Sequence, residues 1–304
     1  MSVNQSLEMA RDVNPDLFAH DASSFDATHA GFAMPREPRI LGLPRNVWPK
    51  ILAPVGMGAL ILVVWELIVR LAHIPEFLLP APSAIALALI RNWPELSGSL
   101  WITLSISLAA LCLAVVLGLA FGVLFTQSKW IELSMFPYAV VLQVTPVVAI
   151  APLIIIWANN VIVSLLICAW LVAFFPILSN TTLGLNSADH NLVNLFKLYG
   201  ASRWQTLRHL RLPSALPYFL AGVRISGGLS LIGAVVAEFV AGTGGTRTGL
   251  ASRILESGYQ LQIPRMFAAL LLVSACGVVI FVCLSIVSHF ALRNWHESAI
   301  KGES

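Results

Sequence analysis

The chain has 304 residues, of which 58% are apolar and only 11% charged, and its formal net charge is +3 at pH 7. A soluble domain carries about 25% charged residues, so the composition excludes an ordinary water-soluble fold and predicts an all-α membrane protein. We expect no nucleic-acid partner. The four cysteines lie in apolar runs without metal-ligand spacing, so we expect neither a metal site nor a cofactor in this chain.

The chain begins with a polar segment, residues 1–47, of mixed charge. It lacks the short apolar core of a signal peptide and predicts a flexible cytoplasmic tail. A membrane domain is expected at 48–293, followed by a cytoplasmic C-terminal tail at 294–304. Within that domain, charge-poor segments of membrane-spanning length predict six spans, at about 51–70, 100–126, 133–157, 161–184, 217–240 and 266–292.

The Lys and Arg residues outside the predicted spans are more numerous on the side that holds the N-terminus. Loops rich in Lys and Arg stay in the cytoplasm, so both termini are predicted to be cytoplasmic. On the opposite side, three prolines interrupt the segment 74–83, and Ser83 is expected to cap a short helix that runs to about Asn92. This helix is either interfacial or an ordinary connector.

Several residues inside the spans leave two interpretations open. Gly118 and Gly122 form a G-x-x-x-G pair, which lets helix backbones approach closely in a homodimer or within one chain. Gln143, Pro146 and Pro152 are candidates for the translocation path, because prolines free carbonyl groups that a water-filled cavity can satisfy; a packing kink is the alternative. Glu238 is either a residue of this path or a carboxylate hydrated at the interface.

A polar and basic segment between about residues 186 and 216 separates the fourth and fifth spans. Gly200 is expected to break a first short helix, and Ser202 to cap a second one. Leu212-Pro213 and Leu216-Pro217 are expected to end the second helix and return the chain to the membrane. Two short helices around a glycine would form a rigid knob on the cytoplasmic side, which a partner could push by leverage.

This loop resembles the cytoplasmic coupling loop of binding-protein-dependent ABC-importer permeases. Gly200, then nine residues, Leu210, one residue and Leu212-Pro213 match the type and spacing of the family motif. The family's Glu-Ala-Ala element does not match, because Asn194, Leu195 and Phe196 occupy its positions. The resemblance implies that an ATPase subunit contacts the loop through residues of the matched segment: Tyr199, Gly200, Ala201, Ser202, Arg203, Leu210, Leu212 and Pro213.

From about residue 50 onward the chain is similar to the nitrate/sulfonate/taurine branch of these permeases, as the segments 77–83, 145–153, 215–218 and 233–239 indicate. The closing segment 293–298 resembles members associated with thiamine-pyrimidine uptake. This resemblance implies a type I ABC-importer permease fold in a bacterial inner membrane. It also implies a dimer of ATP-binding subunits, a second permease copy (a homodimer) and an extracytoplasmic solute-binding protein. The imported solute would be a sulfonate, taurine, nitrate or a thiamine precursor.

Two other functions fit the sequence less well. An ion-coupled secondary transporter would favour paired intramembrane carboxylates and inverted repeats, and neither is evident. An intramembrane enzyme would need a motif such as His-Glu-x-x-His, which is missing. The chain also contains no Gly-Lys-Ser/Thr, which a phosphate-binding loop requires. We therefore expect this chain not to be an enzyme and ATP to be hydrolysed in a separate subunit.

Overall fold

The computed structural model describes residues 39–40, 43–44, 47–242 and 248–293. The predicted C-terminal tail and most of the predicted N-terminal tail lie outside the described residues, as does the glycine run at 243–247. The chain divides into two compact units, Met1–Leu60 and Ile61–Ser304, with the boundary inside a helix. The first unit holds a two-stranded antiparallel pair, β1 (Arg39–Ile40) and β2 (Leu43–Pro44), and the beginning of α2 (Val47–Leu71).

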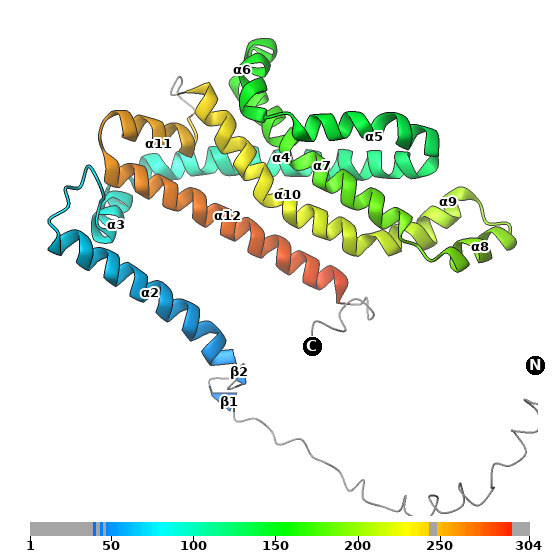
Figure 1. Cartoon of the computed structure of the whole chain (residues 1–304), viewed down its shortest axis with the longest axis horizontal. Coiled ribbons are helices and arrows are strands. Elements are labelled where there is room, and N and C mark those ends of the chain that lie inside the picture. Colours follow the sequence, from blue (N-terminus) through cyan, green and yellow to red (C-terminus); the bar gives the residue numbers. More distant parts are fainter. Residues whose placement is uncertain (1–38, 41–42, 45–46, 243–247, 294–304) are drawn as a thin grey trace, which may run out of the picture. The chain divides into compact units, whose positions relative to one another are not determined.

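The described residues of the second unit form helices that are joined by short turns and loops (Figure 1). Its helices after α2 are α3 (Pro82–Arg91), α4 (Trp93–Gln127), α5 (Lys129–Val144), α6 (Val147–Ala158), α7 (Val161–Asn186), α8 (His190–Leu198), α9 (Arg203–Thr206), the π-helical turn η2 (Leu207–Arg211), α10 (Leu212–Ala241), α11 (Leu250–Tyr259) and α12 (Ile263–Leu292). In the described part of the chain, five helices are long and apolar enough to cross a membrane, or six if α5 and α6 together form one span. The predicted all-α membrane fold is confirmed.

The third expected span, 133–157, is not one straight helix. It is divided into α5 and α6, which are bent by 99° at Thr145 and Pro146. Thr145 is extended, with φ −67° and ψ 122°, because a residue that precedes proline is driven out of the helical region. A polar turn separates α6 from α7: Asn159 is left-handed at φ 48°, and the Asn160 side chain accepts a hydrogen bond from Val163 N.

Helix α7 lies between α4 and α10, and glycines permit the close approach. A Cβ on Gly118 would lie 2.7 Å from Ile177 Cγ2, and a Cβ on Gly122 would lie 2.7 Å from Thr181 Cγ2. Both threatened side chains belong to α7. The G-x-x-x-G pair therefore serves packing within the chain, and the alternative of a homodimer seam at these two glycines is wrong. On α10, Gly233 meets the α7 backbone at Ala169 in the same way.

The short helix after the proline-rich segment begins two residues earlier than expected, because its N-cap is Ala81 and not Ser83. Pro82 opens α3, where its missing N–H costs no hydrogen bond. Ser83 does not cap this helix, because its backbone N–H and its hydroxyl both donate to the Glu66 carboxylate, at 3.0 and 2.7 Å. Glu66 also accepts from Arg70 Nε. Ser83 therefore links the end of α2 to the start of α3 instead of capping α3.

Candidate functional site

The predicted loop forms two short helices around a glycine turn. The Asp189 side chain caps α8 by accepting a hydrogen bond from Asn191 N at 2.8 Å. Gly200 has φ +70°, which is the left-handed region that favours glycine. Ser202 then begins α9 with a capping box: its hydroxyl accepts from Gln205 N, and the Gln205 side chain accepts from Ser202 N. The expected break and the expected cap are both confirmed.

The second short helix does not end at Leu212-Pro213. Residues from Arg203 to Ala241 form one continuous apolar helix of 39 residues, so this part of the prediction is wrong. The π turn η2 precedes Pro213, and Leu212 N donates to Leu207 O across it. Proline has no N–H, and its ring collides with the preceding turn of an α-helix; a wider turn at that point lets the helix continue. Consequently the loop is a direct extension of α10.

The base of the loop is anchored in the helical bundle. Leu207 is 1% exposed and Leu210 8% exposed, and Leu207 packs in a cluster with Leu185 and Ala215. Arg211 Nη1 donates to the carbonyl oxygen of Thr126 at the end of α4. Leu210 is therefore an internal anchor and not a contact surface, although the motif singled it out.

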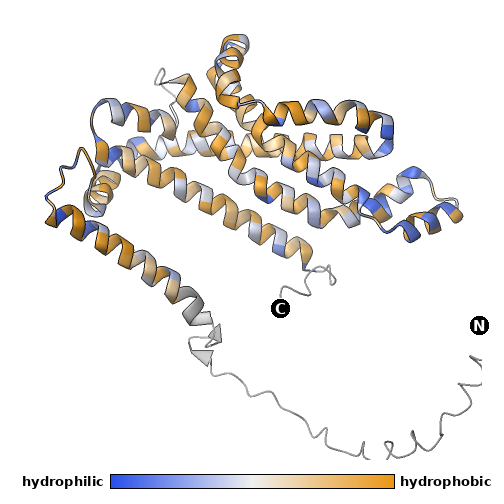
Figure 2. Ribbon diagram, in the orientation of Figure 1, coloured by the Kyte–Doolittle hydropathy of each residue, from blue (hydrophilic) through white to orange (hydrophobic). Residues whose placement is uncertain are grey.

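The segment that forms the loop mixes hydrophilic and hydrophobic residues (Figure 2), and the apolar side chains at its tip are exposed to solvent. Leu198 and Tyr199 are each 84% exposed, and Trp204 is 65% exposed. Aromatic residues are enriched at protein interfaces, so this tip has the chemistry of a docking surface. Sequence analysis had selected Tyr199 but missed Leu198 and Trp204. The signal that could have found them is a large apolar residue on each side of the Gly200 turn.

The predicted translocation residues are not alike in their surroundings. Gln143 on α5 and the prolines at 146 and 152 are exposed, and their role in a path stays a prediction. Glu238 is 1% exposed. Its Oε1 accepts from Thr103 Oγ1 at 2.8 Å and its Oε2 accepts from Ala251 N at 2.9 Å. This carboxylate is therefore neither at a hydrated interface nor open to a path in this conformation.

The contacts of Glu238 join three helices. Thr103 belongs to α4, Glu238 to α10 and Ala251 to the first turn of α11, and Leu250 N completes the set by donating to Thr103 Oγ1 at 2.9 Å. We call these residues the polar junction. A carboxylate at a helix N-terminus satisfies backbone N–H groups that have no partner inside the helix. Gly249 lies so close that a Cβ there would collide with the Glu238 carboxylate.

In the described part of the chain, no three His, Cys, Asp or Glu residues lie together in a way that could hold a metal ion. The features that stand out are a long apolar bundle, a polar junction at one end of it, and a capped loop with an exposed apolar tip at the other (Figure 1). They define a helical membrane protein with a capped, exposed loop.

Comparison with known proteins identifies the class. Residues 114–294 match the family described as binding-protein-dependent transport system inner membrane component. The riboflavin transport system permease protein RibX of Chloroflexus aurantiacus is 36% identical over 86% of this chain and 96% of its own length. The formylaminopyrimidine transport permease protein ThiX of Halalkalibacterium halodurans is 33% identical, over 79% and 95%. The chain belongs to this family of ABC-importer permeases.

The fold agrees with a solved structure of the same kind. A chain from the crystal structure of an amino acid ABC transporter with histidines superimposes with a TM-score of 0.55, covering 68% of this chain and 97% of that one. The two sequences are only 16% identical, so this similarity concerns the fold alone. The chain is a multi-pass membrane component of a transport system that depends on a binding protein.

Proposed function

We propose that this chain is the permease subunit of an ATP-driven importer and that an ATPase subunit docks on the loop formed by α8 and α9. The observation that carries the proposal is the exposed apolar tip, Leu198, Tyr199 and Trp204, on a loop whose other exposed residues are mostly polar. Large apolar side chains that stand in water favour a partner that covers them. ATP is hydrolysed in that partner, and loop and tip lie in the cytoplasm.

The same geometry supports a mechanism of coupling. Because α9, η2 and α10 are one continuous helix, a displacement of Trp204, the residue of the docked tip that lies on α9, moves α10 without a hinge between them. Helix α10 packs closely on α7 through Gly222 and Gly233, so a movement of α10 also displaces α7. Closing of the ATPase dimer draws two such loops together and opens the pathway outward, and hydrolysis resets it. A second copy of this chain supplies the other half.

For the solute, we propose a small polar heterocycle that an extracytoplasmic binding protein delivers. Support comes from the two relatives named for riboflavin and formylaminopyrimidine transport, at 36% and 33% identity. Sulfonates, taurine and nitrate are the competing solutes. Purifying the tagged chain from its native membrane tests both parts of the proposal. A co-purified ATPase in about equal amount supports the permease role, and the solute bound to the accompanying binding protein decides the class.

Substitution of Gly200 tests the docking. A Cβ at Gly200 would meet no other atom of the chain within 4 Å, so Gly200→Trp leaves packing within the subunit intact but places a bulky group at the docking turn. We expect transport to be lost while the protein still inserts. Gly200→Ala separates backbone strain from bulk. The matched control is Gly98→Trp. Gly98 lies at the end of α4 that is remote from the loop, and a Cβ there also meets no atom within 4 Å. Normal uptake by Gly200→Trp would show that the ATPase does not dock at this turn.

A further inference from the structure

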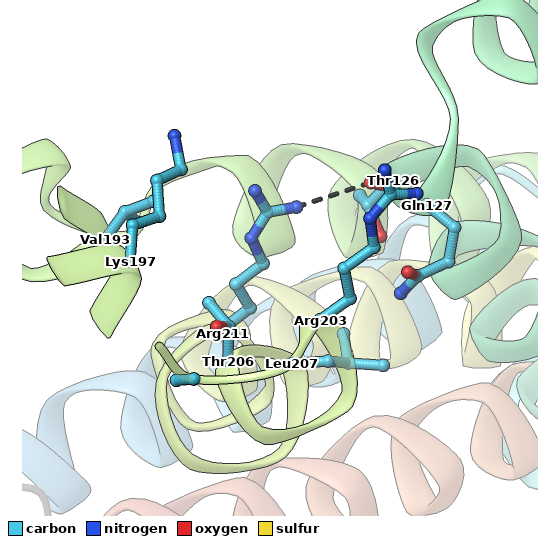
Figure 3. Close-up of a pocket in the computed structure, with 9 residues that line it drawn as sticks. Thr126, Gln127, Val193, Lys197, Arg203, Thr206, Leu207 and Arg211 are labelled. Carbon is cyan, nitrogen blue, oxygen red and sulfur yellow. Dashed lines mark hydrogen bonds between the residues drawn. The ribbon is translucent and has the colours of Figure 1, made fainter. Parts of the chain in front are cut away.

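A small basic cavity lies where the end of α4 meets α8 and α9 (Figure 3). Its volume is about 220 Å³. Three cationic side chains line it: Lys197 from α8, Arg203 from α9 and Arg211 from η2. Thr126 and Gln127, the last two residues of α4, form the opposite wall. In the close-up, Arg203 and Arg211 both extend from their helix toward these two residues.

The charges around this cavity are not balanced within the described residues. No carboxylate there lies within 4 Å of Lys197, Arg203 or Arg211. Arg211 donates to the Thr126 carbonyl at 3.3 Å, which satisfies one donor of its guanidinium and leaves the charge uncompensated. Three like charges around one small space repel each other, so an anion in the cavity would relieve the repulsion and accept their remaining N–H groups.

The position of the cavity indicates where such an anion comes from. The apolar helix α4 ends at Gln127, and the next residues include Lys129 and Trp130, whose ring is 81% exposed. Basic residues together with an exposed tryptophan at the end of a membrane helix are typical of the headgroup level of a bilayer. Arg and Lys are the side chains that bind phosphate groups, and basic pockets between membrane helices bind anionic headgroups.

We propose that this cavity binds the phosphate of an anionic phospholipid headgroup. Lys197 and Arg203 on the loop and Arg211 at its base would then contact one phosphate, which sits against the end of α4. Such a lipid would hold the loop against the end of α4, a helix that lies far from the loop in the sequence. The inference goes beyond transport and does not depend on the direction of transport, because it requires only that α4 crosses a bilayer.

Lipid retention tests this proposal directly. The full chain, purified with the subunits that accompany it, is placed in bilayers of phosphatidylcholine with a minor share of phosphatidylglycerol, and retained lipids are identified by native mass spectrometry. We expect phosphatidylglycerol to be enriched on the wild-type protein. The double variant Lys197→Gln/Arg211→Gln should lower that enrichment roughly tenfold, since each cation near the surface contributes to the attraction.

Three further proteins make the result specific. Arg208→Gln removes a cation of the same loop that is exposed and does not line the cavity, and it should retain the wild-type enrichment. Lys197→Arg/Arg211→Lys keeps both charges and should retain it too. The single variant Lys197→Gln, at an exposed position, should still fold and lose part of the enrichment, which keeps the test decisive if the double variant is unstable.

Four outcomes would overturn the proposal. Equal enrichment in the double variant would show that the lipid binds elsewhere, and an equal loss in Arg208→Gln would show a diffuse basic surface. Displacement of phosphatidylglycerol by millimolar inorganic phosphate would identify a free anion as the ligand. Enrichment that is missing in the complex and appears only after the accompanying ATPase is removed would mean that acidic residues of the partner fill the cavity.

Discussion

The polar junction and the α8–α9 loop are both polar regions of a very apolar chain, but they are built in opposite ways. At the junction, Glu238 is 1% exposed and each of its carboxylate oxygens accepts a hydrogen bond. At the loop, Tyr199 is 84% exposed and a Cβ at Gly200 would meet no atom of the chain within 4 Å. One region is closed on itself and the other is open.

This difference separates stability from recognition. A buried polar group whose partner is removed keeps its desolvation penalty, so the residues of the junction should determine whether the subunit folds. An exposed side chain contributes little to the stability of the folded state, so the residues of the loop tip are free to fit the surface of a partner. Substitutions in the two regions should therefore affect different measurements, and four predictions test this.

Glu238→Ala should have the largest effect on stability. It leaves the Thr103 hydroxyl and the Ala251 N–H without their buried acceptor, and we expect a loss of about 3 kcal/mol. Thermal unfolding of the detergent-purified protein measures it. The control is Glu256→Ala, which removes a carboxylate from a partly exposed pair with Arg253 and should cost less than about 1 kcal/mol. Equal melting temperatures for the two variants would remove the basis of the comparison.

Gly118→Val extends the closed side of the comparison into the bundle. The new side chain would overlap Ile177 on α7, and overpacking of this kind costs about 2 kcal/mol. We expect a lower melting temperature and an unchanged oligomeric state by light scattering. Gly228→Val is the matched control, because a Cβ at Gly228 on α10 meets no atom within 4 Å. A variant at Gly118 that melts normally but dissociates the assembly would restore the homodimer interpretation.

Gly249→Ala should have a smaller effect at the junction. Its Cβ would collide with the Glu238 carboxylate, but the start of α11 can shift slightly, so we expect a loss of about 1 kcal/mol. Combining it with Glu238→Ala provides a sharper result. If the collision is the cause, the double variant should be no less stable than Glu238→Ala alone. Additive losses in thermal unfolding would show that Gly249 has another role.

Much of the loop could be read from the sequence because its signals are local. Gly200 and Ser202 act on their immediate neighbours, and both formed the expected turn and cap. The junction could not be read in this way: Thr103 and Glu238 are 135 positions apart. Only the packing of α4, α10 and α11 brings them together, so Glu238 looked like an isolated intramembrane charge.

The remaining differences also arise from contacts that local rules do not contain. Ser83 has the residue type of a helix cap, but Glu66 on the preceding helix takes both of its donors. Leu212-Pro213 has the appearance of a helix end, yet the π turn before it lets the helix continue. In each case a nearby turn, or a partner on the adjacent helix, overrides a correct local preference.

Tyr199→Ala/Trp204→Ala should have the smallest effect on the subunit itself. Both side chains are largely exposed, so the melting temperature of the isolated chain should change by the equivalent of about 0.5 kcal/mol or less. Docking should respond quite differently, because exposed aromatic residues are the typical anchors of an interface and truncating one costs about 2 kcal/mol of binding. We expect a more than tenfold fall in the amount of ATPase that co-purifies, and a matching loss of uptake. Gln205→Ala is a less suitable control because the Gln205 side chain takes part in the capping of α9, whereas Arg208→Ala changes an exposed side chain of the same loop outside the tip. If the double variant binds the ATPase normally, the apolar tip is not the docking surface. Contact with the membrane would then have to explain why these apolar side chains are exposed.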